Sequence, residues 1–312
     1  MRRMMNKLTP FWLKYCISEV LYKIFRIKMK INNNEPTIME FDETVNYIID
    51  NKVSVSRFGD GEFQWIFQNR SERNFERNSL ELSQSLLSVL RNDNEKLLVC
   101  IPKVFSGISQ YNMQAREYWG ICIGLYGMNW LKILNKDKIY ADTQFTRPYM
   151  DYKSKSHVNM KFELLKKIWN DRNVLIVEGD KSRFGIGDDL LAGAKSIKRI
   201  LAPSENAFES RNKIYKIVLK HVKTENDTLV LLSLGPTATV LASELTGDGV
   251  QAIDIGHLDI EYNWFLRKAT KKEAIEGKYV NEIVKKGYQV GDIANNTLNS
   301  IYQSQIVDRV EA

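Results

Sequence analysis

The sequence predicts an α/β fold, a Rossmann-like, doubly wound and mostly parallel sheet with helices on both faces. Three observations predict it. From about residue 37, short and almost continuously apolar runs alternate with longer segments of helical periodicity. The runs lack the apolar–polar alternation of half-exposed strands and are typical of buried parallel strands. Polar clusters follow four of them, at the sheet edge where such folds bind ligands.

Each element follows from its own pattern. Apolar residues three or four positions apart predict helices at 38–50, 80–92, 117–135, 158–169, near 188–195, at 207–222 and at 237–246. Short apolar runs predict strands at 53–58, 96–102, 138–143, 173–179, 196–203, 228–235 and 250–256. The run at 173–179 is the clearest, because Asn173 and Gly179 bound it. The charged stretch 265–312 indicates a helical or mobile tail.

The charge divides the chain into three parts. Residues 1–32 carry eight Lys and Arg residues against one acid, which equals the whole net charge of +7. The remaining residues are therefore neutral in sum, and the body has no basic field to hold a nucleic acid. We expect a basic amphipathic helix in 1–36, an α/β domain in 37–270 and a helical or mobile C-terminal tail in 271–312.

The basic opening segment allows two interpretations. Its cations are interleaved with aromatic and aliphatic residues, which suits the surface of an anionic membrane. The alternative is that its apolar side packs on the domain or on a second copy, and a homodimer would be permitted. No uncharged run approaches the ~20 residues needed to cross a bilayer, and no signal-peptide cleavage site follows. We expect a cytoplasmic protein, and the first interpretation would place it peripherally on the cytoplasmic membrane face through residues 1–32.

Cysteine and histidine are too sparse for a metal cluster of their own. The three cysteines, Cys16, Cys100 and Cys122, form no C-x-x-C pair and are interpreted as reduced thiols. Only three histidines are present. Any metal is therefore expected on carboxylates.

The cluster RFGDGE, residues 57–62, offers such carboxylates. Its glycines allow a sharp turn and close approach to a ligand. Asp60 and Glu62 form a D-x-E pair of hard oxygen ligands that suits Mg²⁺ or Mn²⁺ bridging to a diphosphate. Arg57 could hold a phosphate with two hydrogen bonds. For the tripeptide Asp60-Gly61-Glu62 alone, the alternative is a solvated turn with a surface salt bridge to the arginine.

Two further clusters contain candidate anion-binding residues. In EGDKSRFGIGDD (178–189), Lys181 and Arg183 lie on a Gly-rich loop near an expected helix N-terminus. A dinucleotide fingerprint lacks its third Gly, because that position is Leu190, and a P-loop is excluded. In SLGPT (233–237), Gly235 ends a strand, and Thr237 could cap the next helix or contact a ligand. Structural roles remain open for both clusters.

The fourth cluster, DIGHLDIEY (254–262), contains acid–base groups. His257, Asp259 and Glu261 alternate and would share one face if the segment were extended. A carboxylate near a histidine could act as general base toward a hydroxyl nucleophile. The alternative is a buried histidine paired with an acid.

Three motif blocks in this order, VSRFGDGEF, LIVEGDKSRFGIGDDLLAGAKSIKRILAPSENAF and GPTATVLASEL…GVQAIDIGHLDIEYNW, are similar to the bacterial GT-D type glycosyltransferases. The resemblance covers roughly residues 38–270. It implies a metal-dependent transferase that uses a UDP-sugar, typically UDP-glucose, in polysaccharide biosynthesis or protein glycosylation. The family's D-x-E motif holds the nucleotide diphosphate and Mn²⁺, which places these on Asp60 and Glu62, with Arg57 beside them.

The same resemblance implies roles for the other clusters. Lys181 and Arg183 would lie near the donor phosphates, and His257, Asp259 and Glu261 near the sugar or acceptor. The acceptor would be a glycan, a lipid-linked oligosaccharide or a glycoprotein. Two alternatives remain: another enzyme on this fold, such as a methyltransferase or dehydrogenase, and a nucleotide-sugar-binding partner without activity.

Overall fold

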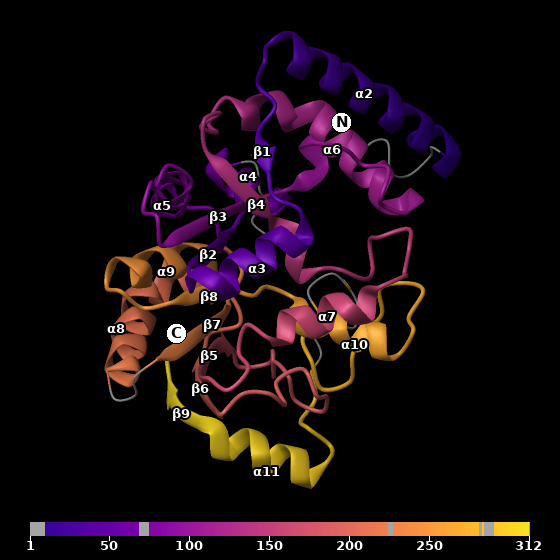
Figure 1. Cartoon of the computed structure of the whole chain (residues 1–312). Coiled ribbons are helices and arrows are strands. Elements are labelled where there is room, and N and C mark those ends of the chain that lie inside the picture. The colour runs from indigo at the N-terminus through magenta and orange to yellow at the C-terminus, as the bar shows by residue number, and fades with distance from the viewer. Residues whose placement is uncertain (1–9, 69–74, 224–226, 281–282, 284–289, 312) are drawn as a thin grey trace.

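The computed structural model describes residues 10–68, 75–223, 227–280, 283 and 290–311 (Figure 1). Within them, nine strands form one sheet in the order β1-β4-β3-β2-β8-β7-β5-β6-β9, and every strand pair is parallel. The strands are β1 (Thr37–Ile38), β2 (Ser54–Arg57), β3 (Leu97–Ile101), β4 (Ile139–Asp142), β5 (Asn173–Gly179), β6 (Ser196–Ala202), β7 (Thr228–Ser233), β8 (Ala252–Asp254) and β9 (Ile306–Arg309). The predicted parallel α/β sheet is confirmed.

Helices cover both faces of this sheet. They are α2 (Phe11–Ile31), α3 (Phe41–Asn51), α4 (Asp60–Ile66), α5 (Leu80–Leu90), α6 (Met113–Leu131), α7 (Val158–Lys166), α8 (Arg211–Val222), α9 (Pro236–Gly247), α10 (Leu258–Leu266) and α11 (Asn296–Gln305). Short 3₁₀ turns lie at Lys103–Phe105, Thr143–Thr146 and Ala207–Ser210. Helices begin where the sequence supplies caps; for example, Ser79 and Asn112 accept backbone amides at the starts of α5 and α6.

Successive strand residues point into different cores, as the period of two in a strand requires. In β5, Val174 and Ile176 belong to the core beneath α3, α7 and α10. Their neighbours Leu175 and Val177 belong to the core beneath α8 and α9. A third core joins α2, α4, α5 and α6 to the face of β3 that carries Leu97, Val99 and Ile101. Both sheet faces are therefore buried, which explains the unbroken apolar runs in the sequence.

The N-terminal helix α2 is part of the folded domain. It packs along α6, and Tyr22, Phe25 and Met29 on its inner face are buried. Gly120, Gly124 and Gly127 of α6 make this approach possible, because a Cβ at each would lie 2.5–2.8 Å from atoms of α2. No described helix combines the length and apolarity needed to span a bilayer.

Four local expectations differ from the structure. The turn expected after β2 is the first turn of α4, and the extended segment considered at 257–262 is the start of α10. Residues 188–195, where a helix was expected, form turns. In the tail, residues 267–280 are irregular, and the chain then adds α11 and the edge strand β9 beside β6. Helical propensity and apolar–polar alternation are local signals. In these segments, tertiary packing determines the secondary structure instead.

Candidate active site

A cavity of about 870 Å³ opens at the carboxyl ends of β2, β4, β5, β6, β7 and β8. All four polar clusters contribute to its lining, through residues 57 and 59–62, residues 179, 182 and 184, residues 233–235, and residues 254, 256, 257 and 259. Residues of α6 and of the segments after β4 and α10 complete the wall. The size is in the usual range for ligand pockets. Parallel strands bring segments far apart in the sequence to one edge, as this fold predicts.

Asp60 and Glu62 lie on the first turn of α4 and both line the cavity. Oδ2 of Asp60 accepts hydrogen bonds from the hydroxyl of Tyr118 and from Nε2 of Gln64 (3.0 Å). Oε2 of Glu62 accepts the amide of Gly59 at 2.8 Å. Burial raises the pKa of Glu62, and the nearby Asp254 carboxylate raises it further.

Arg57 is held at the floor of the cavity, between two strands. Its Nη1 lies 3.4 Å from Oδ1 of Asp254, and its Nε donates to the carbonyl of Thr143 at 3.2 Å. Thr239 Oγ1 also donates to Asp254, at 3.0 Å. Burial raises the pKa of Asp254, and the Arg57 guanidinium lowers it. Gly256 passes beside this pair with φ +51°, and a Cβ there would meet Nη1 of Arg57 at 1.9 Å.

His257 begins α10 and faces the cavity beside a second arginine. Its Nδ1 lies 3.5 Å from Nη2 of Arg147, which follows β4 and also lines the cavity. Together with Arg57, Lys271 and Lys272, Arg147 gives the cavity wall four cationic side chains. The wall also carries seven Asp and Glu side chains, so a diphosphate would bind at these cations rather than in a positive field of the whole cavity.

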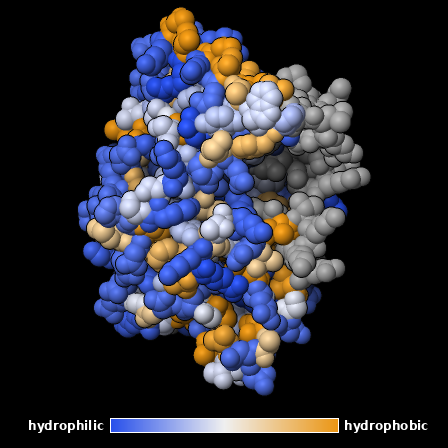
Figure 2. Space-filling view, turned by 90° about the vertical axis from the view of Figure 1, so that its right-hand side faces the viewer, coloured by the Kyte–Doolittle hydropathy of each residue, from blue (hydrophilic) through white to orange (hydrophobic). Residues whose placement is uncertain are grey.

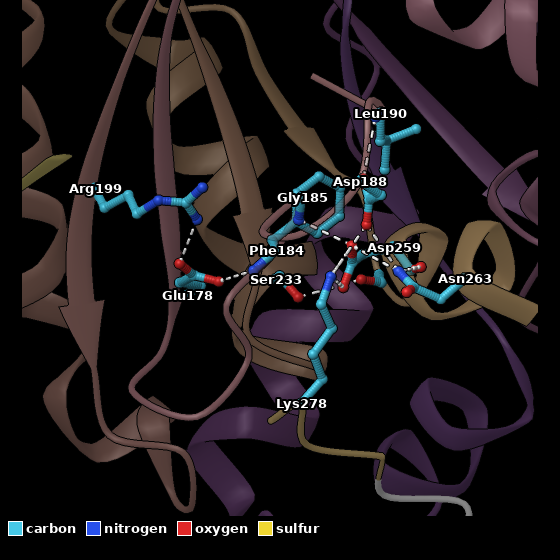
Figure 3. A network of polar contacts seen from close by, with 11 residues as sticks. Glu178, Phe184, Gly185, Asp188, Leu190, Arg199, Ser233, Asp259, Asn263 and Lys278 are labelled. Carbon is cyan, nitrogen blue, oxygen red and sulfur yellow. Dashed lines mark hydrogen bonds and ion pairs between the residues drawn. The ribbon is translucent and has the colours of Figure 1, made fainter. Parts of the chain in front are cut away.

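Asp259 lines the cavity from within a buried polar network (Figure 3). Nζ of Lys278 lies 2.7 Å from its Oδ1 and 3.2 Å from Oδ2 of Asp188. The amide of Gly185 donates to Asp259 at 2.8 Å. Burial raises the pKa of Asp259 to about 7, although Lys278 acts in the opposite direction. The network joins the loop after β5, α10 and the segment after α10 into one support for the cavity.

Glu261 turns away from the cavity. It is fully buried, and its Oε2 accepts the amides of Tyr149 (3.1 Å) and Met150 (2.8 Å). Because α10 is a helix, Glu261 lies about 200° around the axis from Asp259 rather than on the same face. Through these two hydrogen bonds, Glu261 holds the segment after β4 in place.

The structure does not bring Lys181 and Arg183 to the cavity wall. Lys181 is exposed. Nη1 of Arg183 donates to the carbonyls of Gly277 (2.8 Å) and Gly291 (2.7 Å) and so ties the C-terminal segment to this loop. Gly235 does line the cavity, whereas Thr237 is buried behind it and donates to Oε2 of Glu76 at 3.2 Å. The sequence predicted anion binding because two cations lie on a Gly-rich loop. In the structure, Arg183 of this loop contacts the C-terminal segment instead.

Sequence reasoning missed several lining residues. Arg147 had a usable signal, since TQFTR follows a predicted strand just as the four chosen clusters do. Tyr118 was hidden within the apolar pattern of α6. Glu76 is 2% exposed, lines the cavity and accepts the amide of Phe208 at 3.2 Å. Burial raises the pKa of Glu76 to about 7. No local pattern distinguishes Glu76 or Lys278 from a surface residue.

The side chains of the cavity could hold a hard divalent cation only if the substrate supplied some of its ligands. Among the described residues, no three His, Cys, Asp or Glu side chains gather to hold a metal by themselves. Mg²⁺ and comparable ions are commonly held by one or two carboxylates together with substrate phosphates and water. Asp60 and Glu62 at the cavity wall are consistent with that mode, and the hydrogen bonds from Gln64 and Tyr118 to Asp60 end on Oδ2, so Oδ1 would be available to a cation.

A parallel α/β sheet with a ligand cavity at its carboxyl edge is typical of nucleotide-binding folds, which several classes of enzyme share. Within this group of folds, the family profile described as "Glycosyltransferase GT-D fold" matches residues 55–283. This range covers most of the sheet and the clusters that line the cavity. The chain belongs to the GT-D fold family of glycosyltransferases.

Two curated relatives are streptococcal. The chain is 36% identical over 247 residues to the protein named "Probable glycosyl transferase Gly" of Streptococcus gordonii, covering 79% of this chain and 35% of that protein. It is 34% identical over 274 residues to glycosyltransferase GlyD of Streptococcus pneumoniae serotype 4, covering 86% and 32%. The chain thus spans about a third of the length of these relatives.

Solved structures resemble the chain over nearly its whole length. A structure of the domain of unknown function 1792, described as having a distinct glycosyltransferase fold, is 34% identical with a TM-score of 0.82, covering 94% of this chain and 100% of that one. A structure described as a new glycosyltransferase from Streptococcus sanguinis is 33% identical with a TM-score of 0.81, covering 88% and 100%. The predicted family is confirmed.

Proposed function

We propose that the chain is a metal-dependent hexosyltransferase that transfers glucose from UDP-glucose to a hydroxyl group of a glycan acceptor. The observation that carries this proposal is the convergence of the D-x-E acids with Arg57 and Arg147 on one cavity. Anionic leaving groups need such cations, and a divalent ion needs such carboxylates. The names of the relatives support the class of reaction.

The side chains that line the cavity have different proposed roles, which depend on where each lies. Arg57 and Arg147 bind the diphosphate, in place of the Lys181 and Arg183 expected from the sequence. Asp254 fixes the guanidinium of Arg57 at 3.4 Å, and Gly256 leaves the space that this guanidinium fills. A pre-positioned Arg57 loses little freedom when the donor binds, so it strengthens binding of the departing diphosphate.

In the reaction, the acceptor oxygen forms a bond to the anomeric carbon, and the bond from that carbon to the diphosphate oxygen breaks. The diphosphate leaves with the electron pair, and the acceptor hydroxyl loses its proton to a base. His257 is the proposed base, since it faces the cavity, whereas Asp259 is already bonded to Lys278 and Glu261 to two amides. Asp259 and Glu261 then position the wall around His257.

Asp60 and Glu62 are the proposed ligands of Mn²⁺ or Mg²⁺. When bound, such an ion neutralises charge that develops on the diphosphate as the glycosidic bond breaks. Burial and the Asp254 carboxylate raise the pKa of Glu62, and the Arg57 guanidinium offsets this only in part. A cation shared between Glu62 and a diphosphate would supply the remaining positive charge.

For the acceptor, we propose a surface polysaccharide, a lipid-linked glycan or a glycoprotein that already carries sugar. The acceptor is assembled at the cytoplasmic face of the membrane, which agrees with the charge of residues 1–32. An assay with each acceptor class and radiolabelled UDP-glucose separates a transferase from a binding partner that releases no product.

Calorimetry with UDP, UDP-glucose, UDP-galactose, UDP-N-acetylglucosamine, NAD and S-adenosylmethionine, each with and without Mn²⁺, tests the donor site. We expect Mn²⁺-dependent binding of UDP-glucose that Asp60→Asn/Glu62→Gln weakens at least tenfold. Asp93→Asn/Glu95→Gln is a matched control, because it removes an exposed D-x-E pair outside the cavity. Binding of NAD or S-adenosylmethionine without any binding of UDP compounds would overturn the proposal.

A further inference from the structure

Helix α2 has a second apolar face, opposite the one that packs on α6. Leu13, Val20, Ile24, Ile27 and Ile31 are exposed by 37%, 56%, 44%, 59% and 77%. Their spacings of seven, four, three and four residues correspond to about two, one, one and one helical turns, so they form one line along the helix. We call this line the outer stripe of α2. Trp12, 65% exposed, lies next to its first residue.

The outer stripe is about half a turn around α2 from the buried Ser18, Tyr22, Phe25 and Met29. It therefore contributes nothing to the core that holds α2 on the domain. Figure 2 shows apolar side chains, in orange, beside hydrophilic ones at the top of the molecule, where Figure 1 places α2. A continuous apolar line of this kind on a surface helix marks an interaction surface.

The charges beside the outer stripe have one sign. Lys23, Lys28 and Lys30 are exposed on its two flanks, and none forms an ion pair with the part of the chain that the structure describes. The one acid of α2, Glu19, is 2.8 Å from Arg116 on α6 and is thereby neutralised. Arg26 is likewise paired, with Glu35 at 2.7 Å. Within the described residues of α2, the charge left without an ion pair beside the outer stripe is thus cationic.

The exposed apolar residues and the unpaired lysines distinguish between two partners for the outer stripe, a second copy of the chain and an anionic membrane. A second copy docked through the same stripe would bring Lys23, Lys28 and Lys30 near the equivalent lysines, which repel. An anionic bilayer accepts the apolar side chains among its acyl chains and the lysines among its headgroups. The helix is 21 residues long, about 30 Å, and lies on the domain with its stripe outward. It can therefore lie flat on a surface without leaving α6.

We propose that the outer stripe of α2, with Lys23, Lys28 and Lys30, docks this domain onto an anionic lipid bilayer. The helix has two roles at once: its inner face completes the core, and its outer face binds the membrane. The cavity is thereby held close to lipid-bound acceptors. Membrane docking does not depend on which donor the cavity binds, so each can fail without the other.

Co-sedimentation of the full chain with vesicles tests this surface. We compare phosphatidylcholine vesicles with vesicles that also contain phosphatidylglycerol, at low and at high salt. We expect binding only to the anionic vesicles, with loss at high salt. Val20→Gln/Ile24→Gln/Ile27→Gln should weaken binding at least tenfold, and so should Lys23→Gln/Lys28→Gln/Lys30→Gln. Gln is a good helix former, so α2 should persist, and circular dichroism verifies this.

The matched control is Leu80→Gln/Ile139→Gln/Met160→Gln, which removes three equally exposed apolar side chains away from α2. It should bind like the wild type. Failure of the wild type to bind anionic vesicles would overturn the proposal, and so would equal losses in the control and the stripe variant. A wild-type dimer that the stripe variant converts to a monomer, without vesicle binding, would instead assign the stripe to self-association.

Discussion

The guanidinium of Arg57 and the carboxylate of Asp254 meet across the central pair of strands, with Nη1 and Oδ1 3.4 Å apart. Arg57 ends β2 and Asp254 ends β8. The strands on the β2 side all come from residues 37–142, and those on the β8 side from residues 173–309. The pair therefore joins the two halves of the chain where the family's fold forms its ligand crevice.

Substitution of Gly256 should disrupt this pair. In Gly256→Ala, the new methyl group would lie 1.9 Å from Nη1 of Arg57, and the residue would keep φ +51°. Gly249→Ala is the matched control, since Gly249 has φ +76° but nothing within 4 Å of a Cβ. We expect about 1 kcal/mol of destabilisation for the control, from backbone strain alone, and clearly more for Gly256→Ala. Urea unfolding measures both values.

Gly256→Ala should also weaken UDP binding at least tenfold, because Arg57 must move, whereas Gly249→Ala should leave binding unchanged. Equal stability losses in the two variants, or normal UDP binding in Gly256→Ala, would contradict the assigned role of the Arg57 guanidinium.

The sheet and the position of Asp60 and Glu62 at the cavity could be predicted because their signals are local. Apolar runs mark buried strands, and Asp60 and Glu62 follow one directly. The support for the site could not be predicted, since it depends on distant residues. Lys278 reaches Asp259 from the segment after α10, and Glu76 reaches Thr237 across 161 positions. The direction of Arg183 was equally hidden, because it is set by carbonyls at Gly277 and Gly291.

Arginine at position 147 should matter more for the donor than lysine at position 181. Arg147 lines the cavity beside His257, and Lys181 is exposed outside the wall. We expect Arg147→Gln to weaken Mn²⁺-dependent UDP-glucose binding at least tenfold, through loss of a charge-assisted hydrogen bond worth about 1.5–3 kcal/mol. Lys181→Gln should change it less than twofold. Calorimetry measures both affinities. A larger loss of binding in Lys181→Gln than in Arg147→Gln would instead place the phosphate site on the loop after β5.

Glu76 should make the protein less stable as the pH rises through the acid range. Burial raises the pKa of Glu76 from 4.5 to about 7 in the folded protein. The folded state therefore keeps a proton that the unfolded chain releases, and stability falls between about pH 4.5 and pH 7. The loss is at most on the order of 3 kcal/mol, from 1.36 kcal/mol per pKa unit.

Glu76→Gln tests this, because its amide resembles the protonated carboxyl group and does not titrate. We expect the free energy of unfolding of the variant, minus that of the wild type, to increase from pH 5 to pH 8. Glu95→Gln is the control, since Glu95 is exposed, is not among the charges that shift the pKa of Glu76, and should give no such trend. Parallel stability curves for Glu76→Gln and the wild type would show that Glu76 ionises normally.

Lys278 should stabilise the cavity wall through two buried carboxylates. Its Nζ lies 2.7 Å from Asp259 and 3.2 Å from Asp188, whose side chains are 4% and 1% exposed. Lys278→Met leaves both acids without their cation, and removal of one partner from a buried pair costs about 3–5 kcal/mol. Lys52→Met, which breaks an exposed pair with Asp227, should cost no more than about 1 kcal/mol.

The loss caused by Lys278→Met should depend on pH and on Asp259. Without Lys278, the pKa of Asp259 rises above its value of about 7, because the lysine lowers it in the wild type. Asp259 is then protonated in the folded variant at pH 6, so the variant should be closest to the wild type in mildly acidic solution and furthest from it at pH 8. Lys278→Met/Asp259→Asn should recover part of the stability at pH 8. Urea unfolding of the three proteins at both pH values measures the coupling, and a loss that is the same at pH 6 and pH 8 would mean that the ammonium group acts by packing rather than by charge.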